Sequence, residues 1–199
     1  MKILVIGGAG TIGRKLCERL AVNHEVIVGG RNSGDVQIDI ADAASIKQMY
    51  DGIKNLDAVV CVAGEAIWKP LQQMSEEDFY VGIRSKLMGQ VNLVRLGLGQ
   101  LNKGGSFTLT TGILADDPVL MTSSAATVNG AIHSFVKAAS LEMPEAIRLN
   151  VVCPELVEDA AEKYGSFFPG HTPVAMERVV DAYVQSIEGR MNGEIIRVY

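Results

Sequence analysis

The residues best suited to chemistry are the glycines of Gly7–Gly13, GGAGTIG. They follow the apolar run ILVI, which predicts a buried strand, and they precede a helical pattern over Arg14–Leu20. Glycine lets a ligand approach bare backbone, and a helix N-terminus offers unpaired N–H groups to an anion. The pattern predicts a dinucleotide pyrophosphate over Gly8–Thr11, and a surface turn without a ligand is the alternative. The predicted binding residues are Gly7, Gly8, Gly10, Thr11, Ile12 and Gly13.

The turn after the second predicted strand indicates which dinucleotide binds. An acidic residue there would accept the ribose 2′-hydroxyl of NAD, whereas this turn carries Arg31, Asn32 and Ser33 and no carboxylate. Arg31 can make a charge-assisted contact to a 2′-phosphate, so we expect NADP(H) in preference to NAD, unless Arg31 is only a solvated turn residue. Asp39 and Ile40 are expected near the adenine, although Asp39 is equally consistent with a turn former.

Alternating strands and helices must position these residues. The pattern predicts an α/β fold, a doubly wound parallel sheet of about seven strands in a single domain. The later strands are expected at 25–29, 36–40, 57–64, 106–111, 148–154 and 194–199. Helices are expected from an Asp42 cap to Tyr50, from a Ser75 capping box to about Leu101, over 123–142, and from Thr172-Pro173 onward. Residues 155–172 have no clear period and are expected to form a short lid.

Composition excludes several classes of function. With 199 residues, 48% of them hydrophobic and a net charge of −5, the chain has no global basic field to recruit nucleic acid or a membrane surface. It shows no membrane span or signal peptide, and its three scattered cysteines are consistent with buried thiols in the cytoplasm. The three histidines have no metal-ligand spacing, so no metal is expected, and His133 is interpreted as a polar or interface residue.

Taken together, several segments resemble the short-chain dehydrogenase/reductase family over nearly the whole chain. The glycine motif is similar to the family's TGxxGxxG, Ala63-Gly64 stands at the end of its NNAG motif, and 148–154 resembles RVNxVxP. Further matches lie at 85–89, 105–111 and 135–143. The resemblance implies one NAD(P)-binding Rossmann-like domain over 1–199, with Ala63, Gly64, Asn129 and Pro154 also contacting the cofactor.

The resemblance breaks down at the residues that move a proton. The family's Tyr and Lys fall on Ala125 and Asn129, its Ser on Thr111 or Gly112, and its Asn on Lys86. The chain thus resembles a small bacterial branch that keeps the glycine motif and lacks the usual active-site residues. Thr111 retains a hydroxyl, and Lys86 could donate a proton if burial depressed its pKa, or it could be a cation that ties its helix to a loop.

Two lid residues, Tyr164 and His171, could also reach the nicotinamide, although ordinary packing within the lid explains them equally well. Two functions follow. The first is an NADPH-dependent oxidoreductase acting on a small carbonyl or hydroxyl substrate with a non-standard proton donor. The second is a catalytically inactive NADP(H)-binding sensor or partner-binding protein. The resemblance also implies a homodimer or homotetramer built on the two long helices, which are rich in small residues.

Overall fold

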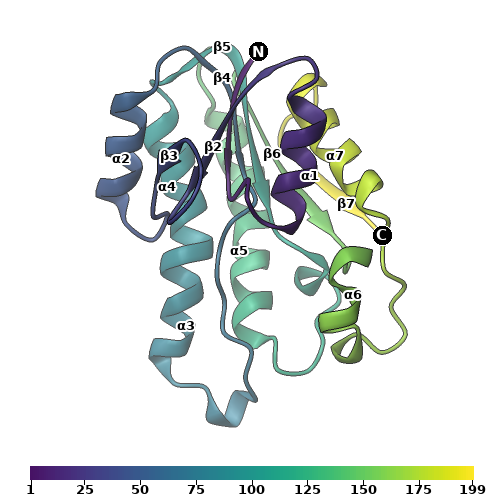
Figure 1. Cartoon of the computed structure of the whole chain (residues 1–199). Coiled ribbons are helices and arrows are strands. Elements are labelled where there is room, and N and C mark those ends of the chain that lie inside the picture. Colours follow the sequence, from purple (N-terminus) through teal and green to yellow (C-terminus); the bar gives the residue numbers. More distant parts are fainter.

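The computed structural model describes residues 1–199 and contains one sheet of seven parallel strands, in the order β3-β2-β1-β4-β5-β6-β7 (Figure 1). The order reverses direction between β1 and β4, and in such sheets ligands bind beyond the carboxyl ends of the strands at the reversal. The predicted doubly wound α/β fold is therefore confirmed. The strands are β1 (Lys2–Ile6), β2 (Glu25–Gly30), β3 (Val36–Gln37), β4 (Leu56–Cys61), β5 (Leu101–Thr110), β6 (Arg148–Pro154) and β7 (Ile195–Val198).

Helices cover both faces of the sheet (Figure 1). One face carries α1 (Thr11–Leu20) and α7 (Met176–Glu188), and the other carries α2 (Ala43–Gly52), α4 (Met88–Gly97) and α5 (Ser123–Ala139). A short helix, α3 (Glu76–Gly82), runs into α4 through a π-helical turn at Ile83–Leu87. The remaining helix, α6 (Glu158–Tyr164), lies within the segment 155–172 that was predicted to form a lid. None of the helices combines the length and the apolar character that a membrane span requires.

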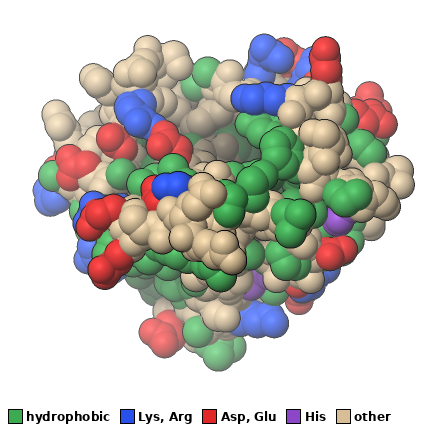
Figure 2. Space-filling model, turned by 90° about the horizontal axis from the view of Figure 1, so that it is seen from below, with side chains coloured by type: hydrophobic (Ala, Val, Ile, Leu, Met, Phe, Trp, Pro, Cys, Tyr) green, Lys and Arg blue, Asp and Glu red, His purple; other side chains and the backbone are tan.

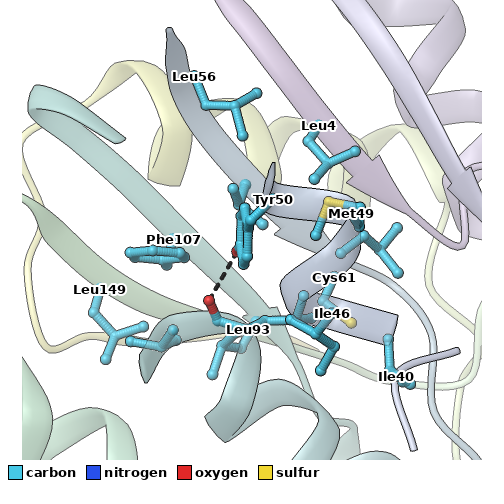
Figure 3. Packing of buried hydrophobic residues seen from close by; sticks show 14 of the residues in the cluster. Leu4, Ile40, Ile46, Met49, Tyr50, Leu56, Cys61, Leu93, Phe107 and Leu149 are labelled. Atoms are coloured by element: carbon cyan, nitrogen blue, oxygen red, sulfur yellow. Dashed lines mark hydrogen bonds between the residues drawn. The ribbon is translucent and has the colours of Figure 1, made fainter. Parts of the chain in front are cut away.

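The sheet separates two hydrophobic cores, as a parallel sheet buried on both faces requires. On the α2–α4–α5 side, the hydroxyl of the fully buried Tyr50 donates to the Leu93 carbonyl oxygen at 2.8 Å (Figure 3). Gly97 leaves room for that ring, because a Cβ there would lie 2.6 Å from the Tyr50 oxygen. The cysteines are free thiols, and burial raises the pKa of each to about 11, so they have little thiolate character.

Several predicted boundaries were wrong, among them the ends of the strands predicted at 36–40 and 57–64, the end of the helix predicted to reach Leu101 and the start of the strand predicted at 106. The third strand ends at Gln37 and not at Ile40, since the Asp39 N–H donates to Ser45 Oγ at 2.9 Å and Asp39 Oδ1 accepts from Ala41 N–H. The helix predicted to reach Leu101 ends at Gly97. A tight turn follows, in which the Gln100 N–H donates to the Gly97 carbonyl oxygen.

The last helix begins at Met176, three residues beyond the predicted Pro173. Val174 forms a parallel bridge with Val157 and donates its N–H to the Leu156 carbonyl at 2.8 Å, which keeps this stretch extended. The Glu158 N–H in turn donates to the Val174 carbonyl at 3.0 Å. These bonds close residues 158–173 into a loop with a narrow base, and this loop contains α6.

The small residues of the long helices mostly serve packing inside the chain. Gly82 faces Ser124 and Val128 of α5, and Gly89 faces Ile40, where a Cβ would lie 2.9 Å from the Ile40 carbonyl oxygen. Only Gly130, of the glycines in α4 and α5, has open space around it. The homodimer or homotetramer therefore stays a prediction.

Candidate functional site

The glycine loop at the end of β1 folds back on the first turn of α1. Gly7 has a φ of +83°, which favours glycine, and a Cβ on Gly13 would lie only 2.2 Å from the Gly7 carbonyl oxygen. Gly10 caps α1 without any side-chain hydrogen bond, and its carbonyl accepts from Arg14 N–H at 3.0 Å. The N–H groups of the first helical turn therefore have no intrahelical acceptor, as an anion-binding helix end requires. This cradle fits the pyrophosphate predicted from the sequence.

The turn with Arg31, Asn32 and Ser33 lines a small hollow of about 330 Å³ at the end of β2. It is held in shape by the Asp35 carboxylate, which accepts from Val28 N–H at 2.8 Å. Arg31 reaches over the end of β1 to form an ion pair with Glu65, and this partner raises the pKa of the guanidinium. Both side chains are more than half exposed, at 57% and 56%, so the pair contributes little to stability. A phosphate can therefore compete for Arg31 at low cost.

Asp39 and Ile40 lie beside this turn. Asp39 lines a groove of about 590 Å³ together with Arg31, between β3 and α2. Its carboxylate accepts from the Ala41 N–H at 2.9 Å, as expected of a turn former. The Ile40 side chain is buried in the core, so only its backbone is available to a ligand. A contact with adenine stays a prediction for both residues.

On the other side of the cradle, the loop after β4 packs on the π-helical turn. Ala63 lies against Gly7, where a Cβ would be 3.0 Å from the Ala63 Cβ. Gly64 has a φ of +142°, and a Cβ there would lie 2.8 Å from Lys86 Cγ. The Lys86 side chain packs directly against the Gly64 backbone, which explains why a residue without a Cβ stands here. π-helical turns within α-helices are frequent at functional sites.

A cavity of about 400 Å³ extends from this loop, and Figure 2 views the molecule from this end, where hydrophobic side chains lie beside a hollow. It brings together residues from six different segments that the sequence analysis had singled out separately. The shared lining residues are Ile12, Gly64, Lys86, Thr111, Ala125, Asn129 and Pro154. Ile12 stands between the cradle residues Thr11 and Gly13 in the sequence and lines the cavity, so the cradle and the cavity are neighbours.

Lys86 lines this cavity and forms no ion pair or side-chain hydrogen bond. Burial lowers its pKa, because the charged form loses water and no carboxylate compensates. The alternative reading, a cation that ties its helix to a loop, finds no acidic partner. Lys86 is therefore a free donor facing the cavity.

Asn129 carries a second free group. The residue is 2% exposed, and its Oδ1 has no hydrogen-bond donor. A buried polar atom without a partner costs free energy, about 1–3 kcal/mol, unless a ligand supplies the missing bond. A sugar hydroxyl can donate to this oxygen, so the residues present fit the ribose end of a dinucleotide.

The sequence analysis missed one partner of Thr111. Thr111 Oγ1 lies 2.9 Å from Nε2 of His133, which is 7% exposed on α5. His133 had been interpreted as a polar or interface residue, and the structure instead buries it behind the cavity wall. The signal available was spacing: positions 125, 129 and 133 are four residues apart and share one face of the helix.

Two residues of the lid, Tyr164 and His171, lie apart from this cavity, although Leu156 and Phe168 of the same segment line it. Tyr164 and two phenylalanines surround Trp68 with ring centroids 5.8–6.1 Å away, and His171 Nδ1 lies 2.9 Å from Glu155 Oε2. Neither Tyr164 nor His171 lines the 400 Å³ cavity, so both pack within the lid, as the alternative held. Tyr164 lines a second cavity of about 550 Å³, whose lining is apolar and aromatic and shares Ala66, Trp68, Leu156 and Phe168 with the first.

Residues 9–182 match a family model described as Enoyl-(Acyl carrier protein) reductase. The solved structure of the protein lin1944 from Listeria innocua is 47% identical, with a TM-score of 0.98 and 100% of both chains covered. A small-chain dehydrogenase solved in complex with NADPH is 26% identical, with a TM-score of 0.88, and the alignment covers 100% of this chain and 96% of that one.

Among curated proteins, the short-chain dehydrogenase/reductase ucsE from Acremonium sp is 28% identical over 132 residues. The alignment covers 60% of this chain and 49% of that protein, so this chain spans about half the length of the relative.

Proposed function

Because the chain belongs to the short-chain dehydrogenase/reductase family, we propose that it is an NADP(H)-dependent oxidoreductase that reduces the carbonyl group of a small molecule. The observation that carries the proposal is the shared wall of the glycine cradle and the 400 Å³ cavity, because Ile12 in the first turn of α1 lines that cavity. Lys86, Thr111 and Asn129, with its unpartnered oxygen, line the same cavity. Similarity to a dehydrogenase solved with NADPH supports the choice of cofactor.

Each part of the cofactor has a proposed partner. The cradle amides of Gly8–Thr11 hold the pyrophosphate, Arg31, Asn32 and Ser33 bind the 2′-phosphate, and Asn129 Oδ1 accepts from a ribose hydroxyl. Ala63, Gly64, Ile12 and Pro154 enclose the nicotinamide end. When bound, NADPH supplies a hydride to the substrate.

Thr111 and Lys86 are the proposed catalytic residues. Both line the cavity, and both carry donors that can point at a carbonyl oxygen. The Lys86 ammonium also opposes the negative charge that develops on that oxygen, and it does so in a site partly shielded from water. Removing one such donor typically slows a reaction by about 10²–10³-fold.

The hydrophobic cavity indicates the kind of substrate. Its lining contains four aromatic side chains and no charged residue, and it shares four lining residues with the cavity that Thr111 lines. We propose that the group attached to the carbonyl is an apolar ring or branched chain, because such a group would bury its surface against Trp68 and Phe168.

The test uses 4-deuterated NADPH and a panel of carbonyl compounds, with aryl ketones and aldehydes at one end and small polar carbonyls at the other. We expect deuterium in the alcohol product of the apolar members, detected by mass spectrometry. Thr111→Val and Lys86→Met should each lower transfer by about 10²-fold, while Lys103→Met, at an exposed lysine, should not. Unchanged deuterium transfer in both variants would contradict the assignment of Thr111 and Lys86 as catalytic residues.

A second function has one specific observation in its favour. Ala125 lines the cavity at the position where the family has its tyrosine, and it has no proton to give. A protein that binds NADP(H) without turnover, as a sensor or partner-binding module, would need no such group. NADPH binding without label transfer from any carbonyl would favour this second function.

Arg31→Ala should reduce NADPH affinity about 10–100-fold and leave NADH affinity nearly unchanged. The reason is that a charge-assisted hydrogen bond to phosphate contributes about 1.5–3 kcal/mol, and NADH has no 2′-phosphate. Isothermal titration with both nucleotides measures the difference. Arg95→Ala, on the exposed face of α4, is the matched control. An equal loss for the two nucleotides would argue against a 2′-phosphate site.

The proposal also includes an oligomeric state and a location in the cell. We expect a homodimer or homotetramer formed through α4 and α5, which sedimentation would measure, and a location in the cytoplasm.

A further inference from the structure

The Thr111–His133 pair lies at the wall between the reaction cavity and the buried interior. Thr111 follows β5, and its N–H donates to the Val152 carbonyl at 3.0 Å, which fixes the backbone. Its Oγ1 lies 2.9 Å from His133 Nε2, and this is the one side-chain hydrogen bond that His133 makes. Thr111 also lines the cavity. A hydroxyl can accept one hydrogen bond and donate another, so Thr111 can contact the imidazole and a substrate at once.

The surroundings of His133 keep its proton exchangeable. Burial lowers its pKa below the ordinary value of about 6.5; Asp116 opposes that shift, whereas Arg197 and Lys137 add to it. The Asp116 carboxylate itself accepts hydrogen bonds from Nε and Nη2 of Arg197, at 3.0 and 3.1 Å, and from the Tyr199 hydroxyl at 2.7 Å. No carboxylate pairs directly with the ring, so no fixed negative charge holds a proton on the imidazole.

We infer that His133 and Thr111 form a proton relay that delivers a proton to the substrate oxygen, an inference that rests on the proposed reductase function. As the carbonyl carbon accepts hydride from NADPH, the Thr111 hydroxyl proton moves to the carbonyl oxygen. The Nε2 proton of protonated His133 moves to Thr111 Oγ1 in the same step. The products are an alcohol, NADP⁺, an intact Thr111 hydroxyl and a neutral His133, which regains its proton from water.

The relay accounts for the missing acid. Ala125 cannot donate a proton, and a positioned general acid is typically worth about 10²–10⁴-fold in rate. Lys86 is free to stabilise the developing charge without giving up its own proton. His133 acts through Thr111 and touches no substrate, so it is a positioning and proton-supplying residue rather than a catalytic one.

The pH profile tests the direction of transfer. Reduction requires protonated His133, so kcat/KM for reduction should fall as pH rises through the lowered His133 pKa. Oxidation of the product alcohol requires neutral His133 and should rise over the same range. His133→Gln keeps a hydrogen-bond donor and acceptor but does not titrate, so we expect both profiles to flatten and the reduction rate to drop about 10²-fold. The surface variant His24→Gln should change neither.

A second readout does not depend on turnover. Nitrogen-15 NMR of labelled histidine gives the His133 pKa directly, and Thr111→Val should shift that pKa while Thr111→Ser should leave it unchanged. Thr111→Ser should also retain most activity. NADPH titration and thermal melting of each variant show that it is folded.

The outcomes separate the two proposals. If wild-type protein reduces no carbonyl, the reductase function is overturned and the relay with it. If wild-type protein turns over and His133→Gln keeps the original rate and pH profile, the relay alone is overturned. A profile that persists in His133→Gln and disappears in Lys86→Met would make Lys86 the donor, which also overturns the relay.

Discussion

Gly13→Ala is expected to weaken NADPH binding by at least about 100-fold, equivalent to about 2.7 kcal/mol. The added Cβ would lie 2.2 Å from the Gly7 carbonyl oxygen and 2.7 Å from the Gly8 Cα. Both are backbone atoms, so relief requires the loop to move, and the loop is the pyrophosphate cradle. Intrinsic fluorescence or calorimetric titration with NADPH measures the change.

The matched control is Gly99→Ala in the turn after α4, where a Cβ meets nothing within 4 Å. It makes the same chemical change in open space and should leave affinity unaltered. Thermal melting of both variants separates lost binding from lost folding. Unchanged NADPH affinity in a folded Gly13→Ala variant would mean that the nucleotide lies elsewhere.

The double variant Ala125→Tyr with Asn129→Lys should raise carbonyl reduction by about 10²-fold or more, because it introduces a general acid and a cation beside it. Both positions line the 400 Å³ cavity and lie four residues apart on one face of α5, so the new side chains project into the same space. Steady-state kinetics with the preferred carbonyl measure the gain.

The control for this gain is Ala125→Phe with Asn129→Lys, which adds the same bulk without a hydroxyl and should be no faster than wild type. If the relay supplies the proton in the native protein, His133→Gln should matter much less in the tyrosine background than in the native one. A double variant that binds NADPH and remains inert would show that the carbonyl does not lie beside position 125.

The features that were predicted well depend on residues close together in the sequence. Asp42 caps α2 by accepting from Ala44 N–H, and Ser75 and Asp78 form the expected reciprocal capping box, because caps depend on residues two or three positions apart. The glycine loop was predictable for the same reason. These features need no knowledge of the rest of the fold.

The features that escaped prediction depend on distant partners. His133 contacts Thr111 from 22 positions away, and Arg31 pairs with Glu65 from 34 positions away. The predicted start of α7 was wrong. Pro173 is typical of a first helical position, but Val174 is held extended by its pairing with Val157. The π-helical turn that carries Lys86 was also hidden, since an apolar pattern does not distinguish it from ordinary helix.

The bridge between Val157 and Val174 also fixes the two points at which residues 158–173 leave the rest of the fold and return to it. Backbone hydrogen bonds join these two points, so the sequence between them can change while the ends of the loop stay in place. A lineage can therefore exchange α6 and its aromatic side chains as an interchangeable insert and acquire a new substrate while the nucleotide grip is inherited intact.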